Sequence, residues 1–229
     1  MRIGHASISE NGNSGRDGKA KAGDQTGKEV CIRNFYKKPW VYLLRVKDRN
    51  LAEKMAKCCE TLCNNNHIGY DQLNRLTLYK ELKKINYDYN KLNVDCETDC
   101  SAFVTVICQC CGINIPYPSG NAPTTSNMVR IFEATGYFDV ITDSAYINTE
   151  ANLRKGDILV GKPATHTVMV LDDGSTVAPD LKPSKTNEEL AAEVIAGKWG
   201  SGNDRRQRLE KAGYNYKEIQ NLVNLILKG

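Results

Sequence analysis

The chain has few aromatic residues, few histidines and no long apolar run, and each shortage excludes a class of protein. No uncharged apolar stretch approaches the roughly 18 residues that a membrane-spanning helix needs, so we expect no membrane insertion. The N-terminal residues lack the apolar core of a secretory signal peptide, so we expect synthesis in the cytoplasm. Few aromatic residues lie among the basic ones, so stacking on nucleic-acid bases has little support, and no nucleic-acid partner is expected.

The nine cysteines favour reduced thiols over disulfides or a metal site. Their number is odd and no export signal is visible, which disfavours a disulfide framework. The five cysteines between positions 96 and 111 do not form two paired Cys-x2-Cys motifs, and the chain has only three histidines, which disfavours zinc. We therefore expect neither a metal nor a cofactor.

Positive charge is concentrated near the N-terminus. The net charge is +4, and residues 1–50 carry eleven Lys and Arg against five Asp and Glu. A basic face suits an anionic cell wall as well as nucleic acid, and charge alone is equally compatible with a solvated surface.

Apolar spacing divides residues 1–178 into helices and strands. It predicts helices at 49–63, 72–85, 100–111 and 126–135, then strands at 156–160, 166–171 and 175–178. Residues 1–30 are rich in glycine and are expected to be irregular. Helices followed by antiparallel strands, with a turn at Asp173-Gly174, indicate an α+β domain.

The C-terminal part is predicted to be a separate unit. Residues 179–186 contain two prolines and no apolar periodicity, which is typical of a linker. Residues 187–229 have helical spacing at 188–196, 204–212 and 216–227, which predicts a three-helix bundle. The expected organisation is therefore a domain at 1–178, a linker at 179–186 and a small domain at 187–229.

Cys100 is the best candidate for a nucleophile. Thr98 or Asp99 can cap the helix predicted there, which places Cys100 in its first turn, where the helix dipole lowers the pKa of a thiol. The rival is Cys96, but the neighbouring carboxylates of Asp95 and Glu97 disfavour a thiolate. Cys100 can also be read as one buried thiol among nine.

A thiol nucleophile needs a base, which is normally an imidazole held by a third polar group. His166 opens an alternating strand and therefore lies on a rigid element. His5 lies in the glycine-rich N-terminal segment, and His67 follows three asparagines in a loop. His166 has the best context of the three.

These motifs together resemble a known group of enzymes. A helix start Asp99-Cys100-Ser101, then Gly156-Asp157-Ile158-Leu159, then a strand from His166 to Leu171 is similar to the NlpC-type and CHAP papain-like hydrolases, above all those of phage endolysins. The resemblance implies a papain-like fold with helices packed on a small antiparallel sheet. It also implies that Cys100 attacks an amide of the peptidoglycan stem peptide or its link to muramic acid, that His166 is the base, and that Tyr70 lies near the oxyanion.

One feature departs from that group. Its members usually place a His, Asn, Gln or Glu on the strand after the catalytic histidine, and residues 175–178 supply none. Either the site works as a dyad or another group orients His166. The candidates are Asp172, Asp173, Asp24 and Gln25.

The tail resembles the CW-seven repeat, the cell-wall-binding module of phage lysins. The match runs through residues 187–227 and includes Trp199, Arg205 and Tyr214. The two aromatic rings can stack on a sugar or pack inside a small core, with the core favoured for Trp199, and Arg205 can meet a stem-peptide carboxylate. Peptidoglycan is the partner that this resemblance implies.

The sequence therefore predicts a peptidoglycan hydrolase of the endolysin type, acting on the wall after release through a holin-type pore. Whether it is an N-acetylmuramoyl-L-alanine amidase or a stem-peptide endopeptidase stays open. The alternative is a non-catalytic wall-binding protein with a degenerate papain-like domain. A zinc-dependent nucleic-acid binder is disfavoured by the cysteine spacing.

Overall fold

The computed structural model describes residues 1–162, 165–176, 185–211 and 214–227. The chain divides into two compact units, Met1–Val177 and Ala178–Gly229. Each unit has its own apolar core. Of the predicted linker, only residues 185 and 186 are among those described.

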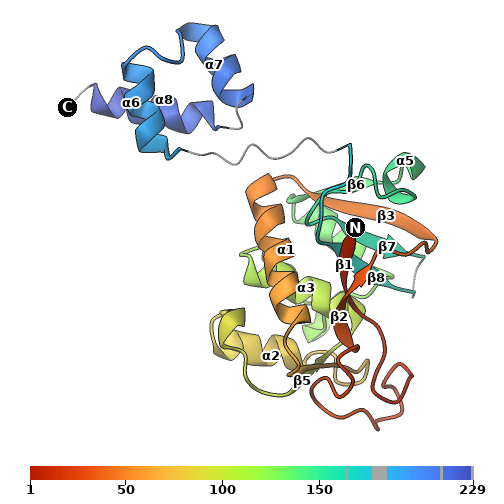
Figure 1. Cartoon of the computed structure of the whole chain (residues 1–229). Helices are drawn as coiled ribbons and strands as arrows, with labels where there is room; N and C mark the ends of the chain where they lie inside the picture. The colour runs from red at the N-terminus through yellow and green to blue at the C-terminus, as the bar shows by residue number, and fades with distance from the viewer. Residues whose placement is uncertain (163–164, 177–184, 212–213, 228–229) are drawn as a thin grey trace. The chain divides into compact units, whose positions relative to one another are not determined.

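An antiparallel sheet of six strands forms the centre of the first unit (Figure 1). In spatial order its strands are β2 (Val30–Asn34), β1 (Arg2–Ala6), β8 (Thr167–Val170), β7 (Ile158–Gly161), β3 (Trp40–Val46) and β6 (Phe138–Ile141). A second, parallel pair consists of β4 (Ile68–Tyr70) and β5 (Cys96–Thr98).

The helices of the first unit are α1 (Arg49–Cys63), α2 (Thr77–Lys84), α3 (Cys100–Cys110), α4 (Met128–Ala134) and α5 (Ser144–Ile147), with 3-10 turns at Tyr89–Lys91 and Pro118–Gly120. Helices α1, α3, α4 and α5 contact the six-stranded sheet, whereas α2 contacts β5 and α3. The expectation of helices packed on a small antiparallel sheet is confirmed. Helix α1 begins where the Asp48 carboxylate accepts hydrogen bonds from the backbone N–H groups of Asn50 and Leu51. Gly4 lets α1 approach β1 closely, because a Cβ there would lie 2.2 Å from the Cys59 sulfur.

The sheet buries apolar side chains on both faces. The larger core lies on the side of α1 and α3 and includes Met169 of β8. The smaller core lies on the opposite face and includes Val168 and Val170 of β8 and Ile3 of β1. Because side chains alternate along a strand, His166 and His5 belong to the face of the smaller core.

Three helices form the second unit. They are α6 (Asn187–Ile195), α7 (Gly202–Lys211) and α8 (Tyr216–Ile226), close to the ranges that the sequence predicts, although the expected end of α7 at 212 lies outside the described residues. Helix α6 begins with a capping box in which Thr186 and Glu189 satisfy each other's backbone N–H groups. Their shared core contains Leu190, Val194, Leu209, Ile219 and Val223.

Two predictions about strands are wrong. Residues 1–30 are irregular only from 7 to 29, because residues 2–6 form β1, which is buried between β2 and β8. The predicted strand at 175–178 is absent at 175 and 176, while 177 and 178 lie outside the described residues. Gly174 and Thr176 donate instead to the carbonyls of Leu153 and Ala151, and β1 is the neighbour of β8 on that side.

The predicted helix at 72–85 is also too long at its start. The Asp71 carboxylate accepts hydrogen bonds from the backbone N–H groups of Leu73 and Asn74 at 2.5 and 3.2 Å. An aspartate bonded to the backbone two and three residues later stabilises a turn, so α2 begins only at Thr77.

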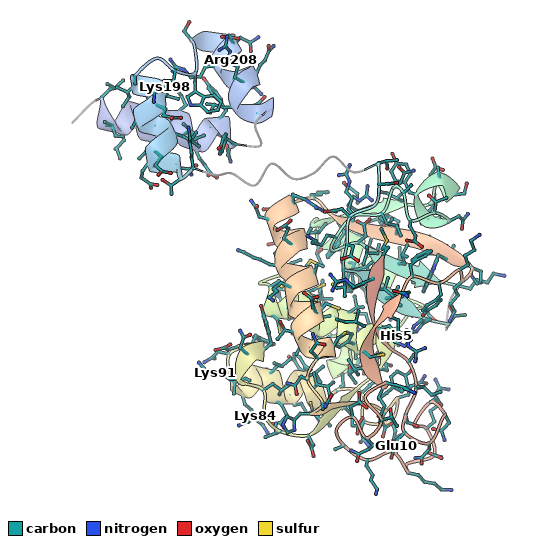
Figure 2. The ribbon with its side chains drawn as sticks, viewed as in Figure 1. His5, Glu10, Lys84, Lys91, Lys198 and Arg208 are labelled. Carbon is teal, nitrogen blue, oxygen red and sulfur yellow. The ribbon has the colours of Figure 1, made fainter. Side chains whose placement is uncertain are left out.

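Glu97 on β5 is a buried carboxyl group surrounded by other acids. It is 3 % exposed, and neither carboxylate oxygen has a hydrogen-bond partner among the described residues. Burial raises its pKa to about 8, and the charges of Asp71 and Glu29 add to the effect, followed by those of Glu10 and Asp24. Figure 2 labels Glu10 in the loop after β1. Glu97 is therefore a protonated acid at neutral pH.

We expect Glu97→Gln to stabilise the protein at pH 8 and to have no effect below pH 4. Between an ordinary value of 4.5 and about 8 the folded chain keeps a proton that the unfolded chain releases. Stability therefore falls as pH rises through this window, by on the order of 1 kcal/mol per pH unit at most, and glutamine removes that loss. Urea unfolding at pH 4, 6 and 8 measures the effect. The exposed Glu133→Gln serves as control, and a Glu97→Gln effect that is the same at all three pH values would contradict the interpretation.

Candidate active site

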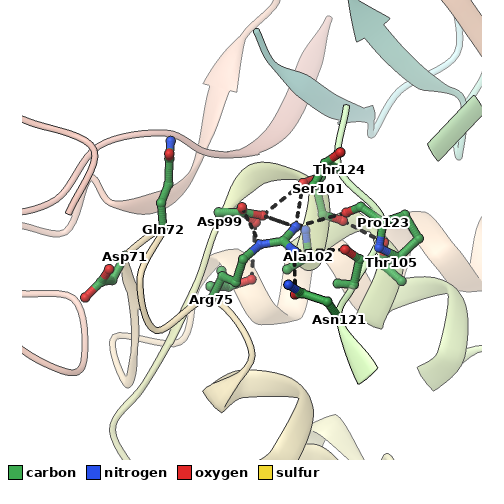
Figure 3. A network of polar contacts seen from close by, with 12 residues as sticks. Asp71, Gln72, Arg75, Asp99, Ser101, Ala102, Thr105, Asn121, Pro123 and Thr124 are labelled. Carbon is green, nitrogen blue, oxygen red and sulfur yellow. Dashed lines mark hydrogen bonds and ion pairs between the residues drawn. The ribbon is translucent and has the colours of Figure 1, made fainter. Parts of the chain in front are cut away.

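The start of α3 is held by a buried ion pair. Asp99 caps the helix, its carboxylate accepting from the backbone N–H of Ala102 at 2.7 Å. The Arg75 guanidinium donates to both Asp99 oxygens, at 2.6 and 3.1 Å. Arg75 also donates to the Ser101 hydroxyl and to three further oxygens, those of Asn121 Oδ1, Ala122 O and Pro123 O (Figure 3). The guanidinium thereby ties α3 to the segment at 121–123.

Cys100 is the first residue of α3 and is 7 % exposed. Burial and the Asp99 charge raise the pKa of its thiol to about 12. The backbone N–H groups of Thr167 and Ser101 and the charge of Arg75 act in the opposite direction. The helix start therefore contributes as the sequence suggests, but burial outweighs it, and the resting thiol is neutral.

The hydrogen bond from Thr167 places the Cys100 sulfur at the edge of a strand pair. The His166 carbonyl accepts from Gly161 of β7, so the N–H of Thr167 points to the other side of β8, toward β1. Strands β1 and β8 pair only at Ile3–Val170 and Gly4–Met169. Thr167 therefore has no partner on β1, and its N–H donates to the Cys100 sulfur instead. The sulfur therefore lies beside the backbone of Thr167, the residue that follows His166.

His166 is buried and contacts a second histidine. Its Nε2 lies 3.4 Å from Nδ1 of His5, and its ring stacks with that of Trp40 at 6.3 Å between centroids. Burial lowers the pKa of His166 to about 3, and the charges of His5 and Lys38 add to the effect. The imidazole is therefore neutral and able to accept a proton.

His5 continues a chain of polar contacts behind His166. Its Nε2 lies 2.9 Å from the Ser7 hydroxyl, and its Nδ1 lies 3.3 Å from the Tyr36 hydroxyl. Burial lowers its pKa to about 4, with smaller contributions from Arg33 and Lys38. Figure 2 labels His5 at the end of β1. Residues from both ends of the first unit thus meet at this site.

The four groups that the sequence offered to orient His166 bind elsewhere. Asp172 forms an ion pair with Arg2 at 2.7 Å, and Asp173 pairs with Arg49 at 2.5 Å. The Asp24 carboxylate accepts from backbone N–H groups of its own turn, and the Gln25 amide donates to the carbonyls of residues 22 and 23. In the described part of the chain, none of the four has a hydrogen bond to His166.

Tyr70 of β4 pairs with Thr98 of β5, two residues before Cys100. It is 2 % exposed on β4, and its hydroxyl oxygen accepts a hydrogen bond from Gln72 at 3.0 Å. Burial raises its pKa, and the charge of Cys100 contributes next. Its phenolic proton is therefore retained and can be donated.

The rival residues lie apart from this arrangement. Cys96 is buried in β5, where its thiol donates to the His67 carbonyl, and burial with the Glu97 charge raises its pKa to about 12. The pKa therefore does not separate Cys96 from Cys100, whereas position at a helix start does. His67 is half exposed and pairs with Asp95 at 2.6 Å.

Sequence reasoning missed Arg75 and Trp40, and it placed His5 in an irregular segment. A buried arginine has no local sequence signature, because its partners come from residues 99–101 and 121–123. A signal for His5 did exist in the short apolar pattern Ile3–Ala6, which the glycine-rich residues after it obscured.

The predicted wall-binding residues of the second unit largely serve its core. Trp199 packs against that core, its Nε1 donates to Glu193 at 3.0 Å, and its ring meets Tyr214 edge to face at 5.8 Å. Arg205 donates to the Gly200 carbonyl and to Gln220 at 3.0–3.1 Å. All three residues are partly exposed.

Comparison with protein families matches both units. The model of the endolysin-like domain matches residues 3–177, and that of the CW_7 repeat matches residues 188–227. No curated protein and no solved structure matches the chain. The two matched models define a cell-wall-targeting endolysin, a hydrolase that acts on the cell wall. The chain belongs to the endolysin-like domain family.

We expect Arg75→Met to destabilise the first unit by about 3–5 kcal/mol, because it leaves the buried Asp99 carboxylate without its positively charged partner. Asp99→Asn added to Arg75→Met should restore part of the loss, since asparagine caps a helix without a charge. Urea unfolding measures both variants. Lys84→Met, which removes an exposed pair with Glu81, is the control and should change stability by less than about 1 kcal/mol. A loss from Arg75→Met no larger than this control would contradict the role of the pair.

Proposed function

We propose that the first unit is a papain-like cysteine hydrolase that cleaves a peptidoglycan amide, with Cys100 as nucleophile and His166 as base. One observation carries the proposal. A thiol at a helix start accepts a hydrogen bond from Thr167, directly after a neutral, buried imidazole. A nucleophile, a base and a group behind the base are the parts that covalent catalysis by cysteine needs.

The contacts of His166 indicate which nitrogen accepts the proton. Its Nε2 faces His5, which leaves Nδ1 for the thiol. This assignment requires the tautomer with a proton on Nε2, as inferred from the hydrogen-bond pattern. His5 on β1 then takes the role of the third group that related enzymes carry on the strand after the catalytic histidine, and Ser7 and Tyr36 hold His5.

The pKa directions indicate when the proton moves. Both the thiol and the imidazole are neutral in the free protein, because burial disfavours both charged forms. The proton therefore passes from Cys100 to His166 as the sulfur attacks the amide carbon, and His166 then returns it to the leaving amine. Water hydrolyses the thioester that remains.

Negative charge on the amide oxygen needs donors during attack. Backbone N–H groups at the start of α3 are free of helical partners, and the Tyr70 hydroxyl retains its proton. We assign these groups to the oxyanion. The bond that is cut is either the muramoyl–L-alanine link or a stem-peptide amide, and mass spectrometry of digested walls distinguishes the two.

We expect Cys100→Ser to abolish lysis of wall suspensions, because a hydroxyl is a far weaker nucleophile than a thiolate. His166→Ala should lose about 10²–10⁴-fold in rate, and His5→Ala should lose less, because His5 acts through His166. Cys96→Ser and His67→Ala are the matched controls and should retain most activity. Activity in Cys100→Ser together with inactivity in Cys96→Ser would overturn the assignment. A wild-type protein that binds walls without cutting them would indicate the non-catalytic alternative.

The second unit is proposed to hold the enzyme on the wall, through the exposed edges of Trp199 and Tyr214 and the nearby Arg205. Its three helices have a core of their own, and ten residues separate the two family matches. The chemistry proposed above uses no residue of this unit.

We expect a fragment of residues 1–178 to cleave soluble muropeptides at nearly the rate of the full chain. On intact walls it should be slower by roughly ten-fold, or about 1.4 kcal/mol of apparent affinity, because the second unit raises the local concentration of enzyme. A fragment of residues 180–229 should bind purified walls without cutting them. Parallel assays on muropeptides and walls test this. Equal losses on both substrates would show that the second unit is part of the catalytic fold.

A further inference from the structure

A pocket of about 430 Å³ opens between the segment that joins β2 to β3 and the end of α5. The residues that line it include Phe35, Lys37, Lys38, Trp40, Ile147 and Asn148. None of them takes part in the chemistry proposed above. A cavity of this size suits a short peptide segment rather than a single ion.

The pocket is next to the proposed base. Trp40 forms part of its wall, and the same ring stacks with His166 at 6.3 Å. Lys38 also lines the pocket, and its charge lowers the pKa of both His166 and His5. A group bound here would therefore lie within a few side chains of the bond that is cut.

The lining combines apolar walls with unneutralised positive charge. Phe35, Trp40 and Ile147 provide the walls, and Ile147 and Trp40 belong to the smaller core of the sheet. Lys37 is exposed and Lys38 is half-buried, and neither forms an ion pair within the part of the chain that the structure describes. Such a lining selects a small apolar group that carries an anion.

We propose that this pocket is a substrate subsite that binds a free carboxylate of the peptidoglycan stem peptide, next to the amide that is cut. The proposal rests on the function proposed above. Stem peptides are short, have small side chains and carry free carboxylates close to their amides, which matches the walls, the charge and the position of the pocket. A phosphate polymer of the cell wall fits less well, because it has no apolar group to contact Phe35, Trp40 and Ile147. Lys38 holds the carboxylate, and Asn148 can bond the adjoining peptide group.

The test compares two soluble muropeptides that differ only in whether this carboxyl group is free or amidated. The wild-type chain should cleave the free acid with a kcat/KM about ten-fold higher than that of the amide. Such a ratio corresponds to the loss of one hydrogen bond to a charged group. Lys38→Gln should lose this preference through a higher KM, with kcat little changed. Lys57→Gln, an exposed lysine on α1, is the matched control and should keep the preference.

The amidated substrate separates binding from effects on the base. If Lys38→Gln slows both substrates equally, Lys38 acts on His166 rather than on the substrate, and the proposal is overturned. If neither rate changes, the pocket is not a subsite, which also overturns it. Inhibition of the wild type, but not of Lys38→Gln, by a soluble glycerol-phosphate polymer, with no carboxylate preference, would assign the pocket to wall phosphate instead.

Binding measurements keep the subsite distinct from catalysis. Calorimetry on full-length Cys100→Ser, with and without Lys38→Gln, reports affinity for both muropeptides without cleavage, and the second unit is identical in both proteins. A preference for the free acid that disappears with Lys38→Gln supports the subsite even if the wild type proves inactive, in which case only the catalytic proposal fails. Equal affinity of both proteins for both muropeptides would refute the subsite while leaving the catalytic proposal intact.

Discussion

The Asp99 carboxylate is largely buried, and its ion pair with the Arg75 guanidinium compensates for the cost of burying its charge. The same carboxylate caps α3 and lies next to Cys100, so it has two opposed effects. It satisfies a backbone N–H group at the start of α3, and its charge raises the pKa of the Cys100 thiol. Arg75 reduces the second effect without disturbing the first, because its charge lowers the pKa of Cys100 while its hydrogen bonds fix the carboxylate.

Burial also determines the protonation state of Cys100 and His166 in the free protein. A cysteine and a histidine can rest as thiolate and imidazolium only where both charges are solvated or well paired, and here Cys100, His166 and His5 are each less than a tenth exposed. The neutral pair is the consequence. Under the proposed mechanism, substrate would therefore supply part of the activation, by excluding the remaining water and by offering a carbonyl carbon to the sulfur as the proton moves to His166. This arrangement also keeps the thiol unreactive toward oxidants, since oxidation follows thiolate character and exposure.

The sequence predicts the parts of the fold that depend on local spacing. Helices α1 and α8 have clear apolar periods, α3 is a mostly apolar run, and most of these helices begin at a capping residue, so α1, α3 and the three C-terminal helices lie close to where the sequence predicts them. Strands β1 to β3 were missed because their stability comes from neighbours far away in the chain, and β1 in particular follows no long alternating pattern. For the proposed site, Cys100, His166 and Tyr70 are the residues that motifs in the sequence suggest. The contact between His5 and His166 could not, because it spans 161 positions and depends on the strand order of the sheet.

Strand β1 both completes the sheet and contributes a residue to the proposed site. The sequence suggests that a strand after His166 turns back along β8, yet the neighbour of β8 on that side is the N-terminal strand. Strand β1 closes the gap between β2 and β8, and by ending its pairing at Gly4 it leaves the N–H of Thr167 for the Cys100 sulfur. The next residue of β1 is His5, which contacts His166. Strand β1 therefore completes the sheet, leaves room for the sulfur of the proposed nucleophile and supplies the histidine that contacts the proposed base. This arrangement requires that the two ends of the first unit pair.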